Sequence, residues 1–514
     1  MNIPATSTTL DTKPELILGH PEGLFFLFFT EMWERFSYYG MRSLLVLFLV
    51  SSAAKGGWHW DRADALNLYG SYTFWVYVTG IIGGYIADKF LGARKAVIVG
   101  GFIISAGHVC LALDTHFSFY LGLTLVVIGT GLFKPNISTI VGQLYGRGEL
   151  ENIKRDAGYT LFYMGVNSGA FFGFALCGYI GEKISWPFGF GLAGFFMILG
   201  ALQFYFAQGV FGEIGGKVAD KSAQGVDDQP KNVLRDRLIA ISVFSAFTIV
   251  FWMMFEQAGG SMTIFAADYT SRALEGSFGL LFKIVNTLLL IVPTIVLTWV
   301  LFKLSRATIK RYPLSNFFIY ICFAAVWGLL IWMLAREFAA DKSEIPATWF
   351  GILNSFFIII LAPLFSKLWQ DYWQPSGPVK FAAGLILLGL GFGFLAFGAM
   401  GIPSGAQTAS VSMIWLVMAY LFHTMGELCL SPVGLSYISK LAPSRLFGVM
   451  FGVWYVTTAL GNKLAGMSGS LIDEISSVYS LSTFFLIFTI LPILVGLMML
   501  MMNKWMLRKM HGVY

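Results

Sequence analysis

The chain has 514 residues, of which 57% are hydrophobic and only 12% are charged, and its net charge is +6. A soluble domain carries about 25% charged residues, so this composition excludes an ordinary soluble enzyme, and nothing in it suggests binding to nucleic acid. It predicts an all-α polytopic membrane protein, because a chain in lipid must satisfy its backbone hydrogen bonds within its own helices. The four cysteines and six histidines are scattered, with no spacing typical of a metal site or a disulfide framework.

Apolar runs separated by polar breaks predict about fourteen membrane-spanning helices, each long enough for the roughly 20 residues that cross a bilayer. The predicted spans are 22–50, 66–88, 95–114, 118–142, 157–180, 188–210, 234–266, 277–303, 313–336, 347–369, 378–399, 409–436, 446–470 and 478–504. Lysine and arginine concentrate in the segments on the side of the N-terminus, so the positive-inside rule predicts that both termini are cytoplasmic.

A polar stretch between the sixth and seventh spans predicts a division into two halves. The stretch is rich in Gly, Ala, Asp and Lys, which is typical of a linker. We therefore expect a first six-helix bundle at 22–210, a cytoplasmic linker at 211–233 and a second bundle at 234–505. Cytoplasmic tails are expected at 1–21 and 506–514.

The first span contains an unusual group of charges. Glu31, Glu34, Arg35 and Tyr38 fall within one 100° arc of a helix. A charge at membrane depth costs about 2.5–3.5 kcal/mol and needs a partner or water. The group is either a structural ion pair that holds helices together or a water-accessible site that titrates during transport. An intramembrane cluster of ionisable residues favours the second interpretation.

Three later segments carry further polar residues. The turn between the second and third spans contains Asp88, Arg94 and Lys95. It resembles the corresponding loop of the major facilitator superfamily, which implies a latch between the two halves; an ordinary basic turn is the alternative. Lys134 is a lone cation inside the fourth span, where it faces a hydrated cavity or pairs with the carboxylates of the first helix. Asn167, among small residues of the fifth span, either joins two helices or binds a polar ligand; the sequence leaves this open.

Together these stretches resemble the proton-coupled oligopeptide transporter family of the major facilitator superfamily. The family pattern ExxERFxYYG is matched in full by Glu31, Glu34, Arg35, Phe36, Tyr38, Tyr39 and Gly40. The turn at Asp88, the segment from Phe133 to Asn136 and the Asn167 segment are also similar. In the second half, the resemblance continues around Glu256, Asn354, Glu427, Trp454 and Thr458, although Ser355 stands where the family has a proline.

The resemblance implies a major facilitator fold with two six-helix bundles around a central cavity. It also implies a bacterial symporter that imports di- and tripeptides with protons across the inner membrane, without a cofactor. Arg35, Lys134 and Tyr38 are then expected to hold the peptide carboxylate, and Glu427, Asn167 and Asn354 its amino group. The implied proton-coupling residues are Glu31, Glu34, Arg35, Lys134 and Glu256, and for Glu256 a structural role is almost as well supported. The implied side-chain pockets involve Tyr39, Tyr77, Trp454 and Thr458; core packing is an equal alternative for Tyr77.

One departure concerns two extra helices, at about 277–303 and 313–336. Many bacterial relatives carry an extra pair between the sixth and seventh core helices, whereas here it falls between the seventh and eighth. We expect the pair to pack at the periphery, away from the transport chemistry.

Three other functions compete with this interpretation. A membrane enzyme needs a nucleophile–base pair, a metal cluster or a phosphate loop, and none stands out. A transporter-like sensor stays open, although an intact coupling motif disfavours it. Other solutes of the family, such as nitrate or an amine, also stay open, and Glu427 disfavours an anion. The sequence does not indicate an oligomeric state.

Overall fold

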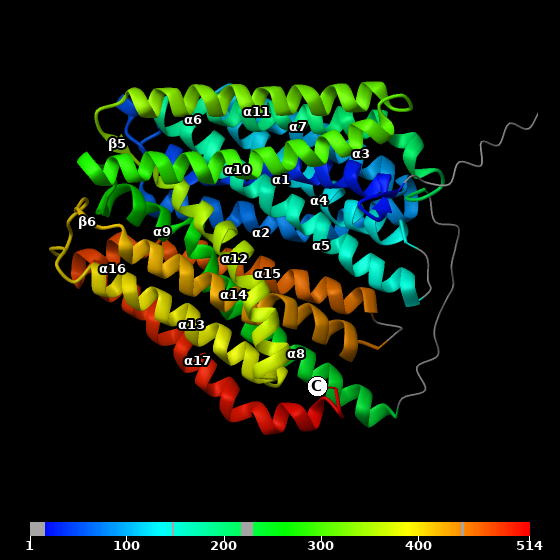
Figure 1. Ribbon diagram of the computed structural model, residues 1–514. Helices are drawn as coiled ribbons and strands as arrows, with labels where there is room; N and C mark the ends of the chain where they lie inside the picture. Colours follow the sequence, from blue (N-terminus) through cyan, green and yellow to red (C-terminus); the bar gives the residue numbers. More distant parts are fainter. Residues whose placement is uncertain (1–15, 146–148, 217–229, 444–446, 514) are drawn as a thin grey trace, which may run out of the picture.

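The computed structural model describes residues 16–145, 149–216, 230–443 and 447–513. Most of the predicted tail at 1–21 and of the predicted linker at 211–233 therefore lies outside the described residues. The described chain is almost entirely helical, and its long helices run side by side (Figure 1). We call the end of the bundle that carries both described chain ends the inner end, and the opposite end the outer end, following the predicted orientation.

The first half contains six spans. They are α1 (Glu22–Val50), α2 (Arg62–Ile86), α3 (Ala93–Ala112), α4 (His116–Gln143), α5 (Glu149–Phe172) continued by the turn η3 (Gly173–Cys177) and by α6 (Gly178–Lys183), and α7 (Trp186–Phe206). Gly92, between α2 and α3, has φ +79°, a left-handed conformation that favours glycine.

The second half contains eight spans. They are α8 (Lys231–Phe255) continued by α9 (Ser261–Ile264), α10 (Gly276–Thr308), α11 (Pro313–Ala339), α12 (Ile352–Lys367) preceded by the turn η7 (Ala347–Gly351), α13 (Gly377–Gly398), α14 (Ile414–Leu441), α15 (Phe447–Gly469) and α17 (Leu481–Lys509). A short helix, α16 (Ile472–Val478), precedes α17 at the outer end.

Three ladders of two-residue strands interrupt the helical pattern. β1 (Leu16–Ile17) pairs with β2 (His20–Pro21) at the inner end. At the outer end, β3 (Thr270–Ser271) pairs with β6 (Val411–Ser412), and β4 (Ala273–Leu274) pairs with β5 (Ser343–Glu344). The hydropathy pattern gave no sign of these short ladders.

The predicted number and order of spans are confirmed, and their bounds differ from the prediction by a few residues. Eleven of the described spans are long and apolar enough to cross a membrane by composition alone. The other three are α1, α2 and α15. α1 is buried at the centre of the first half, and α2 and α15 pack against each other where the two halves meet, so polar side chains on these helices can find partners.

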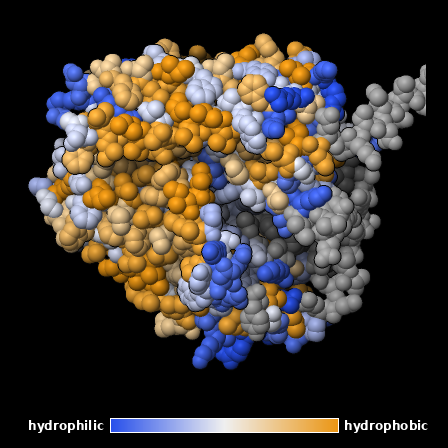
Figure 2. Space-filling model, viewed as in Figure 1, coloured by the Kyte–Doolittle hydropathy of each residue, from blue (hydrophilic) through white to orange (hydrophobic). Residues whose placement is uncertain are grey.

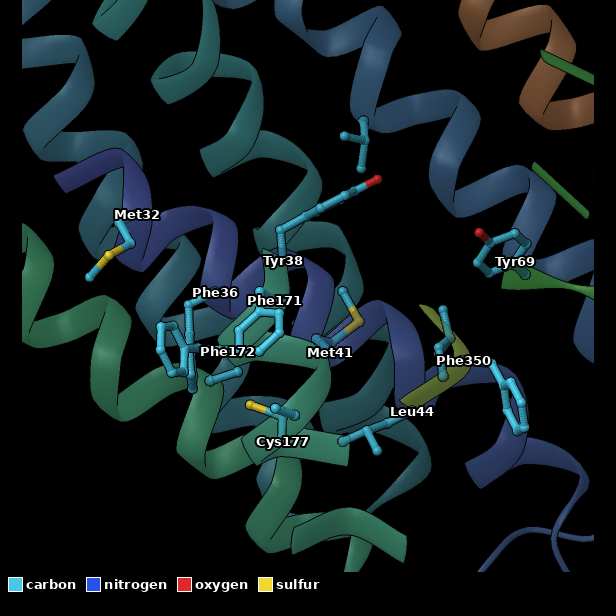
Figure 3. Close-up of a cluster of buried hydrophobic side chains, with 14 of the residues drawn as sticks. Met32, Phe36, Tyr38, Met41, Leu44, Tyr69, Phe171, Phe172, Cys177 and Phe350 are labelled. Atoms are coloured by element: carbon cyan, nitrogen blue, oxygen red, sulfur yellow. The ribbon is translucent and has the colours of Figure 1, made fainter. Parts of the chain in front are cut away.

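The centre of the first half is built around α1, which is buried along nearly its whole length. Phe36 packs with Phe172 and Cys177 on one side of α1 (Figure 3). The ring of Tyr38 leaves this apolar cluster, and its hydroxyl points away from it (Figure 3). The same helix therefore has one face in the core and another toward the interface between the halves.

The two halves meet closely where α2 crosses α15. A Cβ atom at Gly70 would lie 2.7 Å from the Cα atom of Gly466, so the helix backbones touch at this point. Small residues allow such close packing in membranes, where dispersion contacts contribute much of the association energy. This contact lies in the outer third of both helices and holds the halves together there.

The extra pair α10 and α11 lies at the periphery, where Figure 1 shows α11 along one edge of the molecule beside α7. The Ser315 hydroxyl donates to the Gln203 carbonyl at 2.8 Å, and the rings of Phe318 and Phe206 stack 5.6 Å apart. At the inner end, Arg311 binds the Glu22 carboxylate at 3.0 Å. The predicted boundary groups the pair with the second half by chain order, whereas its packing joins it to the first half.

We predict that Gly70→Val lowers the thermal unfolding midpoint of the detergent-purified protein. The new side chain would push α15 away, and overpacking of this kind costs about 1–3 kcal/mol. Gly80→Val is the matched control, because nothing lies within 4 Å of a Cβ atom at Gly80 on the same helix. Equal shifts in the two variants would contradict the proposed close contact.

Candidate functional site

The charged group of α1 is buried and internally paired. Arg35 Nε lies 3.2 Å from Glu31 Oε1, and Arg35 also forms an ion pair with Glu34. The exposed fractions of Glu31, Glu34 and Arg35 are 4%, 0% and 3%. One oxygen of each carboxylate and one guanidinium nitrogen have no hydrogen-bond partner among the described residues. A single cation is therefore shared by two acids, and all three side chains keep unused hydrogen-bonding capacity.

The neighbouring cation, Lys134 of α4, is not part of this pairing. Its Nζ lies 4.4 Å from the centre of the Tyr77 ring, a cation–π contact. In the part of the chain that the structure describes, no carboxylate lies within ion-pair distance of Lys134. The side chain is half-buried and is not part of the wall of the pocket between the two halves, which it borders through its contact with Tyr77. The structure shows no ion pair with the first helix, and a position facing a hydrated cavity stays a prediction.

A pocket lies between the two halves near the middle of the bundle. Its wall includes six of the predicted site residues, namely Tyr39, Tyr77, Asn167, Glu256, Asn354 and Glu427. Tyr163 of α5 also lines it and is 52% exposed although it lies in the middle of a span. Exposure at that position indicates access from a hydrated space. Figure 2 shows a hollow between the two halves toward the inner end.

The second-half side of the pocket carries a carboxylate. Asn354 Nδ2 donates to Glu427 Oε2 at 2.9 Å and contacts Thr424 Oγ1 at 3.2 Å. No lysine or arginine pairs with Glu427 among the described residues. The amide of Asn354 therefore orients a carboxylate that has no counter-ion.

Several predicted residues lie outside this pocket wall. Arg35 and Tyr38 form an adjacent layer of α1, with the guanidinium 5.1 Å from the centre of the Tyr38 ring. Trp454 is buried against Gly434 within the second half, and the hydroxyl of Thr458 donates to the carbonyl of Trp454 at 3.5 Å. Trp454 thus packs between α14 and α15, whereas the hydroxyl of Thr458 bonds within its own helix.

The predicted latch residues behave differently from one another. Arg94 contacts the segment after α7, with Nη1 3.3 Å from the Gln208 carbonyl. Asp88 and Lys95 are exposed, and no ion pair joins either of them to another described residue. The role of this turn as a latch stays a prediction.

Sequence reasoning missed Arg42. This residue forms an ion pair with Glu256 of the second half, and its Nε donates to the Tyr69 hydroxyl at 2.6 Å. Both Arg42 and Glu256 line the pocket. Arg42 lies inside the predicted first span, seven residues after Arg35 and thus on the same helical face. That spacing was the available signal.

Further ion pairs close the outer end of the pocket. Arg62 of α2 binds Asp268 at 2.6 Å and Asp473 at 2.8 Å, and both acids belong to the second half. At the inner end of the described chain, the Arg311–Glu22 pair joins the peripheral helix pair to α1, but no ion pair joins the two core bundles around the pocket. The pocket is therefore closed toward the outer end and hollowed toward the inner end. Among the described residues, no group of three or more His, Cys, Asp and Glu side chains is placed to hold a metal ion.

Comparison with known proteins gives a consistent result. The model of the POT family matches residues 94–226 and 317–487. The chain is 33% identical over 517 residues to the uncharacterized transporter YclF of Bacillus subtilis, covering 96% of each chain. It is 34% identical to the peptide transporter YePEPT of Yersinia enterocolitica, covering 88% of each. Among solved structures, a peptide transporter POT in complex with alafosfalin is similar, with a TM-score of 0.75, 28% identity and 97% of each chain covered.

We predict that Arg42→Met is strongly destabilising, because it leaves the buried carboxylate of Glu256 without its partner. Breaking one side of a buried ion pair costs about 3–5 kcal/mol, whereas replacing both sides by apolar residues is often nearly neutral. The double variant Arg42→Met/Glu256→Leu is therefore expected to unfold at a higher temperature than the single variant. A double variant less stable than Arg42→Met would show that the pair is not the main role of Arg42.

Proposed function

This chain belongs to the POT family, and we propose that it is a symporter that carries di- and tripeptides together with protons by alternating access. Relatives over most of its length include proteins named di-/tripeptide transporters in Lactococcus lactis, at 29% and 30% identity over 98% of this chain. The charges of the site support the same substrate class independently of those names.

The substrate class follows from the charges of the site. A dipeptide is a zwitterion with an amino group at one end, a carboxylate at the other and an amide between them. Its recognition needs an anion, a cation and neutral hydrogen-bonding groups at separate places. Glu427 is the anion, Lys134 is the cation, and Asn167 and Tyr163 lie in the region between the halves.

The observation that carries the proposal is the placement of two unpaired charges on opposite halves. Lys134 lies on α4 of the first half and Glu427 on α14 of the second, and among the described residues neither has a counter-ion. A bound zwitterion would supply both missing partners. It would also attract the two halves toward each other, which is the closing movement that alternating access requires.

Proton coupling follows from competition for Arg35. Glu31 and Glu34 both engage this guanidinium, so in the empty site it has little capacity left for a substrate carboxylate. A proton on either carboxylate removes one negative charge and frees part of the guanidinium. Protonation of the carboxylates then raises the affinity for the substrate, and bound substrate raises the affinity for the proton by the same factor.

The energy source in this proposal is the proton gradient, with no cofactor. The protein would lie in the bacterial inner membrane with both termini in the cytoplasm, so the hollow at the inner end would face the cytoplasm. The aromatic wall of the pocket, with Tyr39, Tyr77 and Tyr163, offers flat surfaces that accept side chains of different shapes. Glu427 disfavours nitrate as a substrate, since an unpaired carboxylate repels an anion.

We predict that proteoliposomes containing this protein accumulate labelled dialanine when an inward proton gradient is imposed. Glu427→Gln and Lys134→Ala should each reduce uptake about tenfold or more, because a hydrogen bond to a charged group contributes roughly 1.5–3 kcal/mol. Initial rates at low peptide concentration measure the effect.

The controls for this experiment are charges of the same kind that lie neither in the pocket wall nor beside it. Glu337→Gln and Lys283→Ala change a carboxylate on α11 and an ammonium on α10 of the peripheral pair, and both should retain uptake. If dialanine is not taken up while an amine without a carboxylate is, the peptide assignment is wrong and the fold assignment stands.

We predict that Glu31→Gln abolishes uphill accumulation of dialanine but retains exchange of peptide across the membrane. The amide cannot gain or lose a proton, while the cavity and the two charged poles are unchanged. Counterflow in the absence of a gradient measures the exchange. Glu22→Gln is the control on the same helix. Gradient-driven accumulation that persists in Glu31→Gln would remove Glu31 from the coupling mechanism.

A further inference from the structure

The outer end of α6 holds the beginning of the eighth core span. Glu182 Oε2 accepts a hydrogen bond from the Ala347 backbone N–H at 2.9 Å. Glu182 Oε1 accepts one from the Thr348 N–H at 2.8 Å and one from the Thr348 hydroxyl at 2.7 Å. The side chain of Glu182 is only 12% exposed. One carboxylate of the first half thus receives three hydrogen bonds from the second half.

The residues held by Glu182 also form part of the substrate pocket. Ala347 and Thr348 both line its wall, at the end nearest the outer surface. We call these two residues the pocket roof. The next residue, Trp349, donates from Nε1 to the Ala175 carbonyl of the first half at 3.0 Å. The position of the roof is therefore determined by bonds that cross between the two halves.

Charged side chains surround the Glu182 contact with alternating signs. Lys183 Nζ lies 2.6 Å from Glu344 Oε2, and Arg272 lies 3.5 Å from Glu344 Oε1 and 3.9 Å from Glu182 Oε2. Burial works to raise the pKa of Glu344, but the hydrogen bond and charge of Lys183, together with Arg272 and Lys55, hold that pKa below its ordinary value. We call Glu182, Lys183, Arg272 and Glu344 the outer clasp.

Outward opening of the pocket requires the outer clasp to separate. The outer end of α6 moves with the first half, and the roof moves with the second. In alternating access the halves rock about the fixed site, so the outer ends of α6 and η7 must part before a solute can enter from outside. Each hydrogen bond to the Glu182 carboxylate would then be exchanged for one with water.

We propose that Glu182 is a positioning residue of the transport cycle, which holds the pocket roof shut and whose release accompanies outward opening. The inference rests on the proposed alternating-access function but not on the identity of the substrate. It goes beyond the pocket residues, since Glu182 acts through Ala347 and Thr348 and has no place in the pocket wall itself. The remaining clasp residues strengthen the contact through charge, although Glu344 is 52% exposed and solvent screens it.

The test measures access to the pocket from outside. A cysteine is introduced at Ser43, a pocket-lining residue of α1 that is 7% exposed, and intact cells are treated with a membrane-impermeant maleimide. The labelling rate is taken above that of the same protein without the introduced cysteine. Glu182→Ala is expected to raise this rate about tenfold or more, since hydrogen bonds to a charged group contribute roughly 1.5–3 kcal/mol. Glu182→Gln should raise it less, because its amide oxygen still accepts a hydrogen bond.

The matched control is Glu275→Gln. Glu275 lies 2.7 Å from Lys342, and this ion pair is at the outer end but joins two segments of the extra helix pair rather than the two halves. Both side chains are more than half exposed, so in this variant the cysteine introduced at Ser43 should be labelled at the rate seen in the parent protein. If Glu275→Gln raised the labelling rate as much as Glu182→Ala, the loss of any charge at the outer end would open the pocket, and the proposal would be overturned.

Two further measurements separate gating from loss of structure. Cys322, a native residue of α11, is fully buried and should stay unlabelled in all variants. If Cys322 is labelled in Glu182→Ala, that variant has loosened as a whole and cannot test the gate. Thr348→Val is then the deciding variant, because it removes one hydrogen bond to the Glu182 carboxylate and keeps the shape of the side chain. Parent labelling rates in both Glu182→Ala and Thr348→Val would overturn the proposal. Since no peptide is used, failure of dialanine uptake would refute the peptide assignment alone.

Discussion

The requirement that shapes this molecule is the pairing of charges inside a membrane. Arg35 serves two carboxylates of its own helix, and all three side chains are removed from water and lipid alike. A buried ion group of this kind adds little net stability, and removing one partner from it is costly. The surrounding helices must therefore keep α1 covered along its length. That requirement explains why a span with charges in its middle is buried along nearly its whole length, with the other helices of the first half arranged around it.

The two ends of the bundle differ in how the halves are joined. At the outer end, the contacts are spread over α1, α2, α6 and their second-half partners, with Arg42, Arg62 and Glu182 each supplying a separate connection. At the inner end the surface is hollowed (Figure 2). Contacts spread over several places can be broken in succession, so no single step has to overcome all of them at once. Such an arrangement suits a protein that changes repeatedly between two forms, each closed at one end of the bundle and open at the other.

Much of the architecture could be predicted from the sequence, because hydrophobic length and charge bias are local properties. The bounds of α1 were obtained at both ends, and the spacing of Glu31, Glu34 and Arg35 placed them on one face. What could not be predicted depends on contacts between distant segments. Arg42 has an ordinary position near a helix end until Glu256 is brought beside it, and the packing of Trp454 against Gly434 follows from the angle between two helices. The docking of α11 on α7 likewise reverses what chain order suggests.

The extra helix pair leaves and rejoins the chain at one place. Ala273 faces Glu344 across the β4–β5 ladder, so the two ends of a segment of two complete membrane spans lie on neighbouring strands. An insertion with adjacent ends can be acquired or removed as one module, because the rest of the chain keeps its path and its sidedness when an even number of crossings is added. The same property makes the β4–β5 ladder a natural fusion point for a rigid marker protein in imaging studies. Both a natural insertion and an engineered fusion are thus tolerated at this ladder, because its two strands bring the ends of the inserted segment together.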